Sequence, residues 1–223
     1  SHDERKERSV MKSILSLACA LLLLFCFAST SAAKEPGFIR LFDGKSLDGW
    51  KESGGKGSFS VADGKIVANG KPMGHLFYVG KVENASFKNF EFKADVMTLP
   101  GSNSGIYFHT KYQKEGWPEA GFECQVNATQ GDTRKTGGLY GIEDVMDVAP
   151  HKDNEWFEYH IIVKGESVTI KIKGKTTLEW VQPESIRSRP DGSRKIGRGT
   201  FAFQAHDPNS KVYFKNVRVK PLP

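Results

Sequence analysis

Cysteine is scarce in this 223-residue chain, which has three in all, and two of them lie within the first 33 positions. If that segment is removed, Cys124 has no partner for an internal disulfide. Packing alone must then stabilise the fold, and a mature chain of roughly 190 residues is long enough for a full core. The sequence also lacks the Cys and His spacing of a zinc site and the glycine-rich loop of a phosphate-binding site.

Long blocks of like charge are also missing. The chain carries 32 Lys and Arg against 26 Asp and Glu, a formal net charge of +6, and the basic residues are spread along it. Nucleic-acid-binding proteins usually gather their basic residues in one run or on one face. We therefore expect no nucleic acid partner.

The first 33 residues differ in character from the rest. Met11 and Lys12 precede an apolar run over residues 14–28, and small residues over 31–33 follow it. This order is typical of a secretory signal peptide, and the run is shorter than the roughly 20 apolar residues of a stable membrane span. The sequence predicts a leader over 1–33 with a signal peptide at Met11–Ala33, and a single domain over 34–223. It also predicts cleavage after Ala33 and export to the periplasm or the extracellular space.

Helical periodicity is almost absent beyond residue 34. Short runs rich in Phe, Val, Ile and Tyr recur instead between Gly, Asp, Asn and Pro, as expected for strands and turns. The expected strands include 38–42, a hairpin over 58–70 that turns at Asp63-Gly64, 75–79, 90–99, three strands within 156–181 that turn at Gly165-Glu166 and Gly174-Lys175, and two closing strands. About a dozen strands without intervening helices indicate an antiparallel β-sandwich. Residues 111–120 and 129–154 are expected to be long loops, which are commonly functional.

Three expected strands, over 103–110, 121–128 and 201–207, alternate apolar and polar side chains. Successive side chains of a strand point to opposite faces, so each strand would have one apolar and one polar face. If the three strands are neighbours, their polar faces form one shallow concavity. It would be lined by Tyr107, His109, Glu123, Gln125, Gln204 and His206. Any one of these residues, taken alone, is more often an ordinary solvated side chain than a functional one.

Two aromatic residues, Trp117 and Tyr140, lie in the expected long loops. Aromatic rings beside a groove can stack on sugar rings, and loops on a rigid scaffold often carry such contacts. The alternative interpretation is that both rings only seal the edges of the sandwich.

Seven short motifs occur in a fixed order between Phe38 and Leu222. They are LFDGKSLDGW, NSGIYF, E-x-Q-V, TGGLYG (136–141), EW (155–156), FQAHD and VYFKNVRVKPL. This set resembles the 3-keto-disaccharide (3-keto-glycoside) hydrolase family. The resemblance implies an all-β, concanavalin A-like jelly-roll β-sandwich of two antiparallel sheets, acting on 3-keto sugars by elimination and hydration. Three positions depart from the family pattern: His109 replaces an Arg, Cys124 an aromatic or aliphatic residue, and Ala128 an Asp or Asn.

The residues disfavour ordinary glycoside hydrolysis, which needs two carboxyl groups about 5–5.5 Å apart in a retaining enzyme. The residue two positions after Glu123 on the same strand face is Gln125, and an amide can act neither as nucleophile nor as acid. The acidic run over 143–147 is expected to lie in a loop, without the strand spacing.

A ketone at C3 changes what the site must supply. It acidifies the C2 proton, so that a base near neutral pKa, a donor for the enolate and help for the leaving oxygen suffice. Histidine suits the base, so we expect His206 to be the base or a metal ligand, and Glu123 a metal ligand or acid/base partner. Substrate contacts are expected from Asn103, Tyr107, His109, Trp117, Gln125, Tyr140 and Gln204.

Alternatives remain open at this point. Glu123 and His206 together could hold a divalent metal ion, although two side chains do not identify which one. His206 could instead cap the turn at Asp207-Pro208. A lectin-like jelly roll that binds carbohydrate without cleaving it is the second functional class, because this fold does not fix function. Convergence of Glu123 and His206 in one pocket would favour the enzyme.

Overall fold

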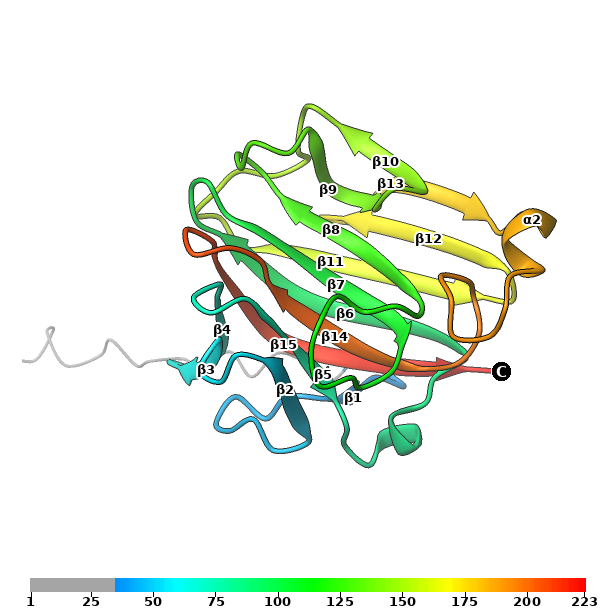
Figure 1. Cartoon of the computed structure of the whole chain (residues 1–223), viewed down its shortest axis with the longest axis horizontal. Helices are drawn as coiled ribbons and strands as arrows, with labels where there is room; N and C mark the ends of the chain where they lie inside the picture. Colours follow the sequence, from blue (N-terminus) through cyan, green and yellow to red (C-terminus); the bar gives the residue numbers. More distant parts are fainter. Residues whose placement is uncertain (1–34) are drawn as a thin grey trace, which may run out of the picture. The chain divides into compact units, whose positions relative to one another are not determined.

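The alternating apolar residues form strands, and these strands build two antiparallel sheets that pack face to face (Figure 1). The computed structural model describes residues 35–223. The expected signal peptide, with its cleavage site and its role in export, lies outside these residues and stays a prediction. Within 35–223, no helix is long and apolar enough to cross a membrane.

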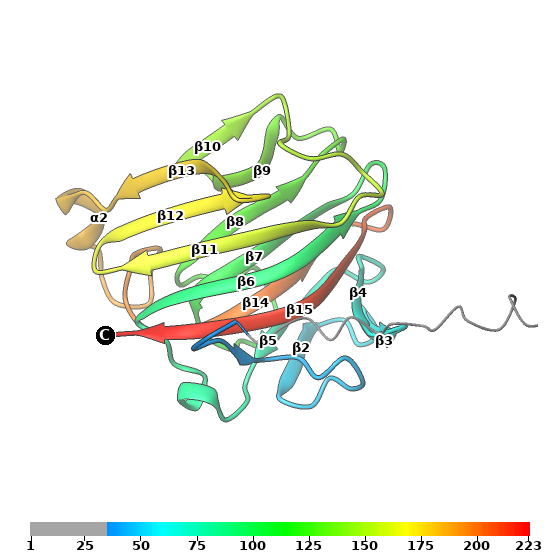
Figure 2. The same cartoon turned by 180° about the vertical axis from the view of Figure 1, so that it is seen from behind.

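The larger sheet has eight strands and forms the rear layer in Figure 1, which faces the viewer in Figure 2. Its order is β13 (Lys175–Val181), β12 (Ser167–Ile172), β11 (Phe157–Lys164), β6 (Asn89–Thr98), β15 (Lys211–Leu222), β4 (Lys65–Asn69) and β3 (Phe59–Ala62), and β1 (Ile39–Arg40) pairs with β15. The strand expected over 38–42 is therefore shorter than predicted.

The smaller sheet has seven strands. Its order is β10 (Glu143–Met146), β9 (Arg134–Leu139), β8 (Phe122–Asn127), β7 (Asn103–Thr110), β14 (Thr200–Ala205), β5 (Gly74–Tyr78) and β2 (Trp50–Gly54). The three strands predicted to carry the polar faces are thus neighbours in the order β8, β7, β14. Helical structure in residues 35–223 is limited to the 3₁₀ turn η1 (Val82–Ala85) and the single turn α2 (Glu184–Arg187).

Aromatic side chains fill the space between the two sheets. Phe92 of β6 lies 4.6 Å from Phe201 of β14, and Phe203 stacks on Phe214 of β15 at 4.1 Å between ring centroids. Cys124 of β8 is fully buried among them as a free thiol, and burial raises its pKa well above the usual value. The apolar faces of β6, β8, β14 and β15 therefore form the core.

The predicted hairpin turn is confirmed. Ala62 pairs with Lys65, and the two turn residues have positive φ angles of 47° for Asp63 and 76° for Gly64, as a type I′ turn requires. The turn between β12 and β13 is displaced by one residue from the prediction. It consists of Lys173 and Gly174, because β13 already begins at Lys175.

The prediction of one long loop over 129–154 is wrong, because β9 and β10 lie within it. The strand pattern was hidden by Gly137 and Gly138, which have no side chains to alternate. A side chain at Gly138 would collide with the backbone of the neighbouring strand, since an added Cβ would lie 2.6 Å from the Val145 nitrogen. Residues 143–146 of the acidic run therefore lie on the edge strand β10 rather than in a loop, and Asp147 follows it.

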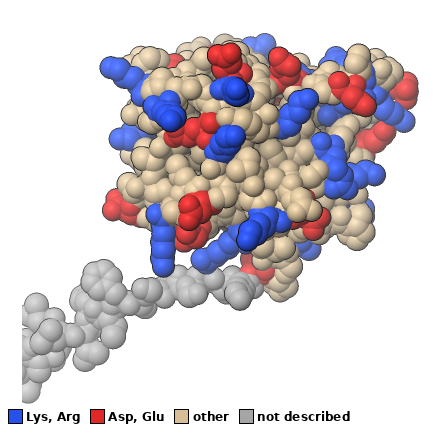
Figure 3. All heavy atoms as spheres, turned by 60° about the horizontal axis from the view of Figure 1, so that its bottom comes forward, with Lys and Arg blue, Asp and Glu red and all other residues tan. Residues whose placement is uncertain are grey.

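Charged side chains of both signs are mixed on the face of the molecule that Figure 3 presents. Figure 3 shows Lys and Arg interspersed with Asp and Glu on the face it presents, without a continuous basic stripe. This mixture on one face agrees with the mild formal net charge of +6.

Candidate active site

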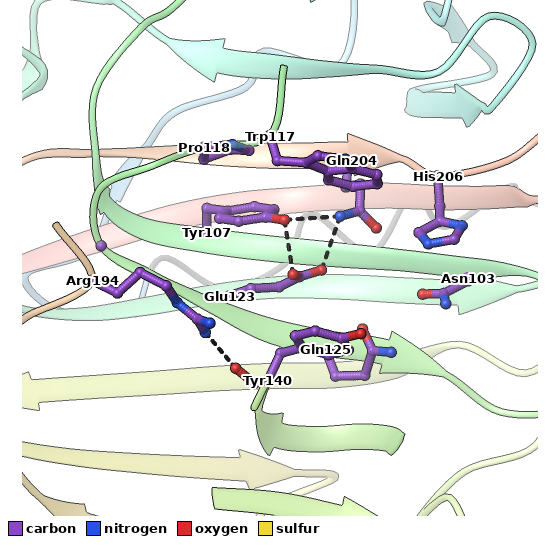
Figure 4. A pocket seen from close by; sticks show the side chains of 11 residues that line it. Asn103, Tyr107, Trp117, Pro118, Glu123, Gln125, Tyr140, Arg194, Gln204 and His206 are labelled. Atoms are coloured by element: carbon purple, nitrogen blue, oxygen red, sulfur yellow. Dashed lines mark hydrogen bonds between the residues drawn. The ribbon is translucent and has the colours of Figure 1, made fainter. Parts of the chain in front are cut away.

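The polar faces of β8, β7 and β14 meet in one pocket of about 350 Å³ (Figure 4). The register places Tyr107 opposite Glu123 and also opposite Ala202, two positions before Gln204. The pocket is lined by Asn103, Tyr107, Trp117, Pro118, Gly121, Glu123, Gln125, Tyr140, Arg194, Gln204 and His206. Its volume lies within the range of roughly 300–1,000 Å³ of small-molecule sites.

Three side chains from three strands form a closed hydrogen-bonded triangle in the middle of the pocket. The Tyr107 hydroxyl donates to Glu123 Oε2 at 2.8 Å, and the Gln204 amide donates to both Glu123 Oε1 and the Tyr107 hydroxyl at 2.9 Å. Both carboxyl oxygens are therefore held in place. Hydrogen bonds of this kind fix a reacting group before the substrate arrives.

Glu123 is tuned for proton transfer near neutral pH. Burial raises its pKa from 4.5 to about 7, outweighing the hydrogen bonds from Tyr107 and Gln204 and the positive charge of Arg194, which favour the ionised form. A carboxyl group with this pKa exchanges a proton readily at neutral pH. In turn, the carboxylate raises the pKa of the buried Tyr107 hydroxyl further above its usual value, although burial is the larger cause.

Gly105 makes room for this carboxyl group. It lies on β7 opposite Gln125, and a Cβ added to it would clash with Glu123 Oε1 and lie 2.9 Å from Glu123 Cδ. Any side chain at residue 105 would push the carboxyl group out of the triangle.

His206 follows β14 and is oriented by its neighbour in the chain. Its Nδ1 donates to Asp207 Oδ2 at 2.9 Å, and the same carboxylate accepts from the Ser210 hydroxyl at 2.6 Å. Hydrogen bonds and the imidazole lower the pKa of Asp207 despite its partial burial. This arrangement leaves His206 Nε2 unprotonated in the neutral ring and free to accept a proton.

Several buried amide oxygens in the pocket have no hydrogen-bond partner. They are Asn103 Oδ1, Gln125 Oε1 and Gln204 Oε1, in side chains that are at least 97 % buried. A buried polar atom without a partner is costly, so a ligand with hydroxyl groups would be favoured there. The amide nitrogens of Asn103 and Gln125 make only long bonds of 3.4 Å, to Gln130 Oε1 and the Arg134 carbonyl.

Aromatic and cationic side chains complete the walls. The Trp117 ring is 46 % exposed and lies 5.7 Å from the His206 ring. Tyr140 is held by a hydrogen bond from its own backbone nitrogen to the Glu123 carbonyl at 2.9 Å, and Arg194 donates to the Tyr140 carbonyl. In Figure 4, His206 and Asn103 lie at one end, the Glu123 triangle in the middle and Arg194 at the other end.

Comparison with known proteins agrees with the resemblance in the motifs. Residues 37–220 match the family of 3-keto-alpha-glucoside-1,2-lyase-like domains. A protein of Bacteroides thetaiotaomicron strain VPI-5482, named 3-keto-disaccharide hydrolase, is 32 % identical over 239 aligned positions, which cover 83 % of this chain and 79 % of the relative. This chain belongs to the 3-keto-alpha-glucoside-1,2-lyase-like family.

Solved structures place this lyase-like domain among jelly-roll proteins. A Parabacteroides distasonis protein classed provisionally as a glycosyl hydrolase superposes with a TM-score of 0.69 at 26 % identity, covering 84 % of this chain and 94 % of that one. A carbohydrate-binding module, CBM66 of Bacillus subtilis, superposes with a TM-score of 0.53 at 11 % identity, over 77 % of this chain and 95 % of the module. The second likeness shows the fold alone. The predicted jelly-roll β-sandwich is thus confirmed.

One predicted contact residue of the lyase-like domain, His109, lies away from the pocket. The pairing of β7 with β14 is irregular between Thr200 and Ala202, where two steps on β14 correspond to three on β7. This β-bulge, with a φ angle of 55° at His109, breaks the two-residue alternation. The ring therefore turns to pack against Phe90 at 5.6 Å instead of facing the pocket.

The environment of His109 is that of a structural residue. Its Nε2 donates to the Lys88 carbonyl at 2.8 Å, and its Nδ1 accepts from the Gly197 nitrogen at 3.2 Å. Burial lowers its pKa to about 4, so the ring is neutral with both nitrogens paired. The expectation that His109 shares the concavity was wrong, because the alternation of side chains along a strand cannot predict a bulge.

Four residues of this site were not anticipated from the sequence. Pro118, Gly121 and Arg194 line the pocket, and His75 of β5 packs its ring 5.5 Å from Trp117 and 5.4 Å from Tyr107. Arg194 lies in a basic stretch rich in Gly and Pro between two strands, which is a signal for a functional loop. His75 carries no such signal, since its position under Trp117 depends on a loop conformation.

The predicted pair of metal ligands shares the pocket without forming a larger donor set. Within residues 35–223, no group of three or more His, Cys, Asp or Glu side chains could hold a metal ion. Both Glu123 carboxyl oxygens already accept hydrogen bonds. A divalent ion between Glu123 and His206 would therefore need its remaining ligands from water, substrate or the neighbouring amide oxygens.

Proposed function

We propose that this protein cleaves 3-keto-glycosides by removing the C2 proton, eliminating the C1 substituent and adding water to the product. The observation that carries the proposal is one pocket that contains both a carboxyl group with a pKa near 7 and a histidine oriented by an aspartate. The family and the name of the Bacteroides relative support the same substrate class. Glu123 is the sole carboxylic acid among the pocket-lining residues, so double-carboxylate hydrolysis lacks its second group.

His206 is the proposed base. Its Nε2 takes the C2 proton, and Asp207 stabilises the imidazolium that results, because its carboxylate already accepts from Nδ1. Electrons of the broken C2–H bond form the enolate, whose charge lies on the C3 oxygen. The amide nitrogens of Asn103 and Gln125 are the nearest weakly engaged donors for that oxygen.

Glu123 is the proposed acid. The enolate re-forms the ketone, a C1=C2 double bond appears and the C1–O bond breaks, and protonated Glu123 gives its proton to the departing oxygen. The leaving group departs as a neutral alcohol. Water then adds across the double bond: its oxygen bonds to C1 while Glu123 takes one of its protons, and His206 returns a proton to C2. Each proton that leaves the substrate is thus accounted for.

Sugar binding falls to the remaining side chains. The amide oxygens of Asn103, Gln125 and Gln204, which have no hydrogen-bond partner, would accept hydrogen bonds from sugar hydroxyl groups. The exposed ring of Trp117 offers an apolar face to a sugar ring. A divalent ion held by Glu123 and His206 could supply Lewis-acid polarisation of the ketone, and chelation tests for it.

A second candidate is a non-catalytic carbohydrate binder. The three unpartnered amides and the exposed tryptophan favour it, since these groups alone would suffice for binding. The raised pKa of Glu123 and the His206–Asp207 pair favour the enzyme, because binding alone requires neither a proton donor nor a proton acceptor.

The test is incubation of the purified protein with a 3-keto-glucoside, with and without a chelator, while the released sugar is measured. We expect release at neutral pH, and loss of release on chelation would establish the metal. Binding without any release, in the presence or absence of added divalent ions, would instead support the carbohydrate binder.

A further inference from the structure

A second pocket, of about 290 Å³, opens beside the candidate active site and contains none of its residues. It is formed where β7 ends, between the loop that follows β7 and the segment that leads into β14. Figure 1 shows both segments at the C-terminal end of β7, in green and orange. The bulge at His109 forms its floor.

Positive charge dominates the walls of this second pocket. Lys111, Lys195 and Arg198 line it against a single acid, Asp191. Asp191 is exposed and pairs with Lys195 at 2.9 Å, so its charge is offset by one lysine. Arg198 uses one nitrogen to donate to the Ser86 carbonyl, and among residues 35–223 its guanidinium has no carboxylate partner. Lys111 and Arg198 therefore remain as uncompensated cations.

A buried hydroxyl points to a missing ligand in the same pocket. Thr110 is 1 % exposed, lines the pocket and has no hydrogen-bond partner for its Oγ1. A buried hydroxyl without a partner costs free energy, and an anionic oxygen beside it would accept a hydrogen bond from it. His109 is neutral, and both of its ring nitrogens already have hydrogen-bond partners. It therefore neither adds charge to this pocket nor offers a hydrogen bond to Thr110.

The two pockets are lined by neighbouring residues of the same two chain segments. Gly121 lines the first pocket and Ala120 the second, while Arg194 lines the first and its neighbours Ser193 and Lys195 the second. The same two chain segments therefore border both pockets, and Arg194 lies between residues that line the second one. Figure 4 places Arg194 at the end of the active site opposite His206.

We propose that the second pocket binds an anionic group, such as a carboxylate or sulfate, on the leaving group of the glycoside. This inference rests on the proposed function for its substrate. With C2 at His206 and the C1 oxygen at Glu123, the leaving group points toward Arg194 and then toward Lys111 and Arg198. The protein would therefore prefer glycosides with acidic leaving groups over neutral ones.

The test compares two ligands that differ in one charge: 4-carboxyphenyl and 4-carbamoylphenyl 3-keto-glucosides. Binding is measured by calorimetry in the Glu123→Gln protein, so that turnover does not interfere, and in His206→Ala if the first variant is unfolded. We expect the carboxylate to bind about tenfold more tightly at low salt. The preference should shrink at high salt, because screening weakens exposed charge pairs.

Variants assign the preference to the second pocket. Lys111→Gln combined with Arg198→Gln should reduce the preference to less than twofold and leave the affinity for the neutral ligand unchanged. Lys164→Gln, which removes an exposed charge at the end of β11 on the other sheet, should leave the preference intact. Inorganic sulfate should compete with the carboxylate ligand and not with the neutral one.

Equal affinity for the two ligands would overturn the inference, as would a preference that survives loss of Lys111 and Arg198. These outcomes are separate from the fate of the proposed function. A parent protein that cleaves both glucosides at equal rates and binds them equally keeps its function and loses the anion site. A parent that cleaves neither, yet shows the charge preference, keeps the anion site and loses the function.

Discussion

The chemistry proposed here depends on two residues that lie about 80 positions apart and line the same pocket. Glu123 and His206 were both selected because they occupy the polar positions of strands with apolar opposite faces. The pKa of Glu123 and the orientation of His206, however, depend on surroundings that the alternation of side chains in the sequence does not reveal. Glu123 owes its raised pKa to burial, and His206 owes its orientation to Asp207.

Substitution of these two residues tests their shared role. Glu123→Gln keeps the size of the side chain and removes its proton, while His206→Ala removes the base. Either change should lower turnover of a 3-keto-glucoside by roughly 10²-fold or more, with the fold intact by circular dichroism. The double variant should lose less than the product of the single losses, because the residues act as one unit. Full turnover in either single variant would assign the chemistry to other groups.

The raised pKa of Glu123 also predicts how stability changes with pH. In the folded protein the carboxyl group ionises at about 7, and in the unfolded chain near 4.5. The stability that the neutral acid contributes is present below pH 4.5 and is lost as the pH rises through 7. Glu123→Gln cannot ionise, so its Tm relative to the parent should rise by about 5–10 °C between pH 5 and pH 8.

Thermal unfolding of both proteins across this pH range measures the difference. The Lys164→Gln variant serves as a control, since its side chain is remote from the pocket, and its Tm relative to the parent should not change with pH. A flat or falling difference for Glu123→Gln would mean that Glu123 ionises at its ordinary pKa, and it would then be a poor acid at neutral pH.

At the scale of elements, β7 carries both the site and its boundary. Its first half alternates regularly and places Asn103 and Tyr107 in the pocket. Beyond Tyr107 the bulge turns His109 into the core and ends the polar face. Sequence parity therefore predicts the first half of this strand and fails at the second, because one inserted residue inverts every side chain that follows.

Gly105 tests whether β7 shapes the active site by leaving space. Gly105→Ala would bring a Cβ into contact with the Glu123 carboxyl group, which must then leave Tyr107 and Gln204. We expect turnover to fall by at least about tenfold, with a small change in Tm because the displaced side chain borders an open pocket. Gly131→Ala is the matched control, since its added Cβ meets nothing within 4 Å, and turnover should be unchanged. Equal turnover in both variants would contradict the need for this space.

The other elements were predictable to the degree that their side chains alternate. The β3–β4 hairpin follows from Asp63-Gly64, and β6 from the buried series that begins with Phe90 and Phe92. Strand β9 was missed because two glycines interrupt its pattern, and β10 because its acidic residues resemble a loop. Arg194, which lines the pocket, was missed because it lies in a loop, where no alternation of side chains indicates the direction in which each one points.

At the scale of the whole molecule, the jelly roll explains why distant residues meet. Sequential strands β7 and β8 lie side by side, and β14 returns after six intervening strands to pair on the other side of β7. Composition and strand spacing predict a sandwich, but they do not predict this order. The family resemblance implied the jelly roll, and the match over residues 37–220 bears out the family; that the three strands are neighbours was only a condition of the sequence argument.

The central claim is that cleavage begins with removal of the C2 proton. The most direct measurement is the mass of the 3-keto sugar released from a 3-keto-glucoside in D₂O, taken early in the reaction. His206 is partly exposed, so its imidazolium exchanges the proton taken from C2 for a solvent deuteron before hydration. The product should therefore gain one carbon-bound deuterium at C2. A control incubation of the product alone corrects for spontaneous exchange, and His206→Ala should release neither sugar nor label. Release of sugar without carbon-bound deuterium would contradict the account, since C1–O cleavage would then proceed without the enolate.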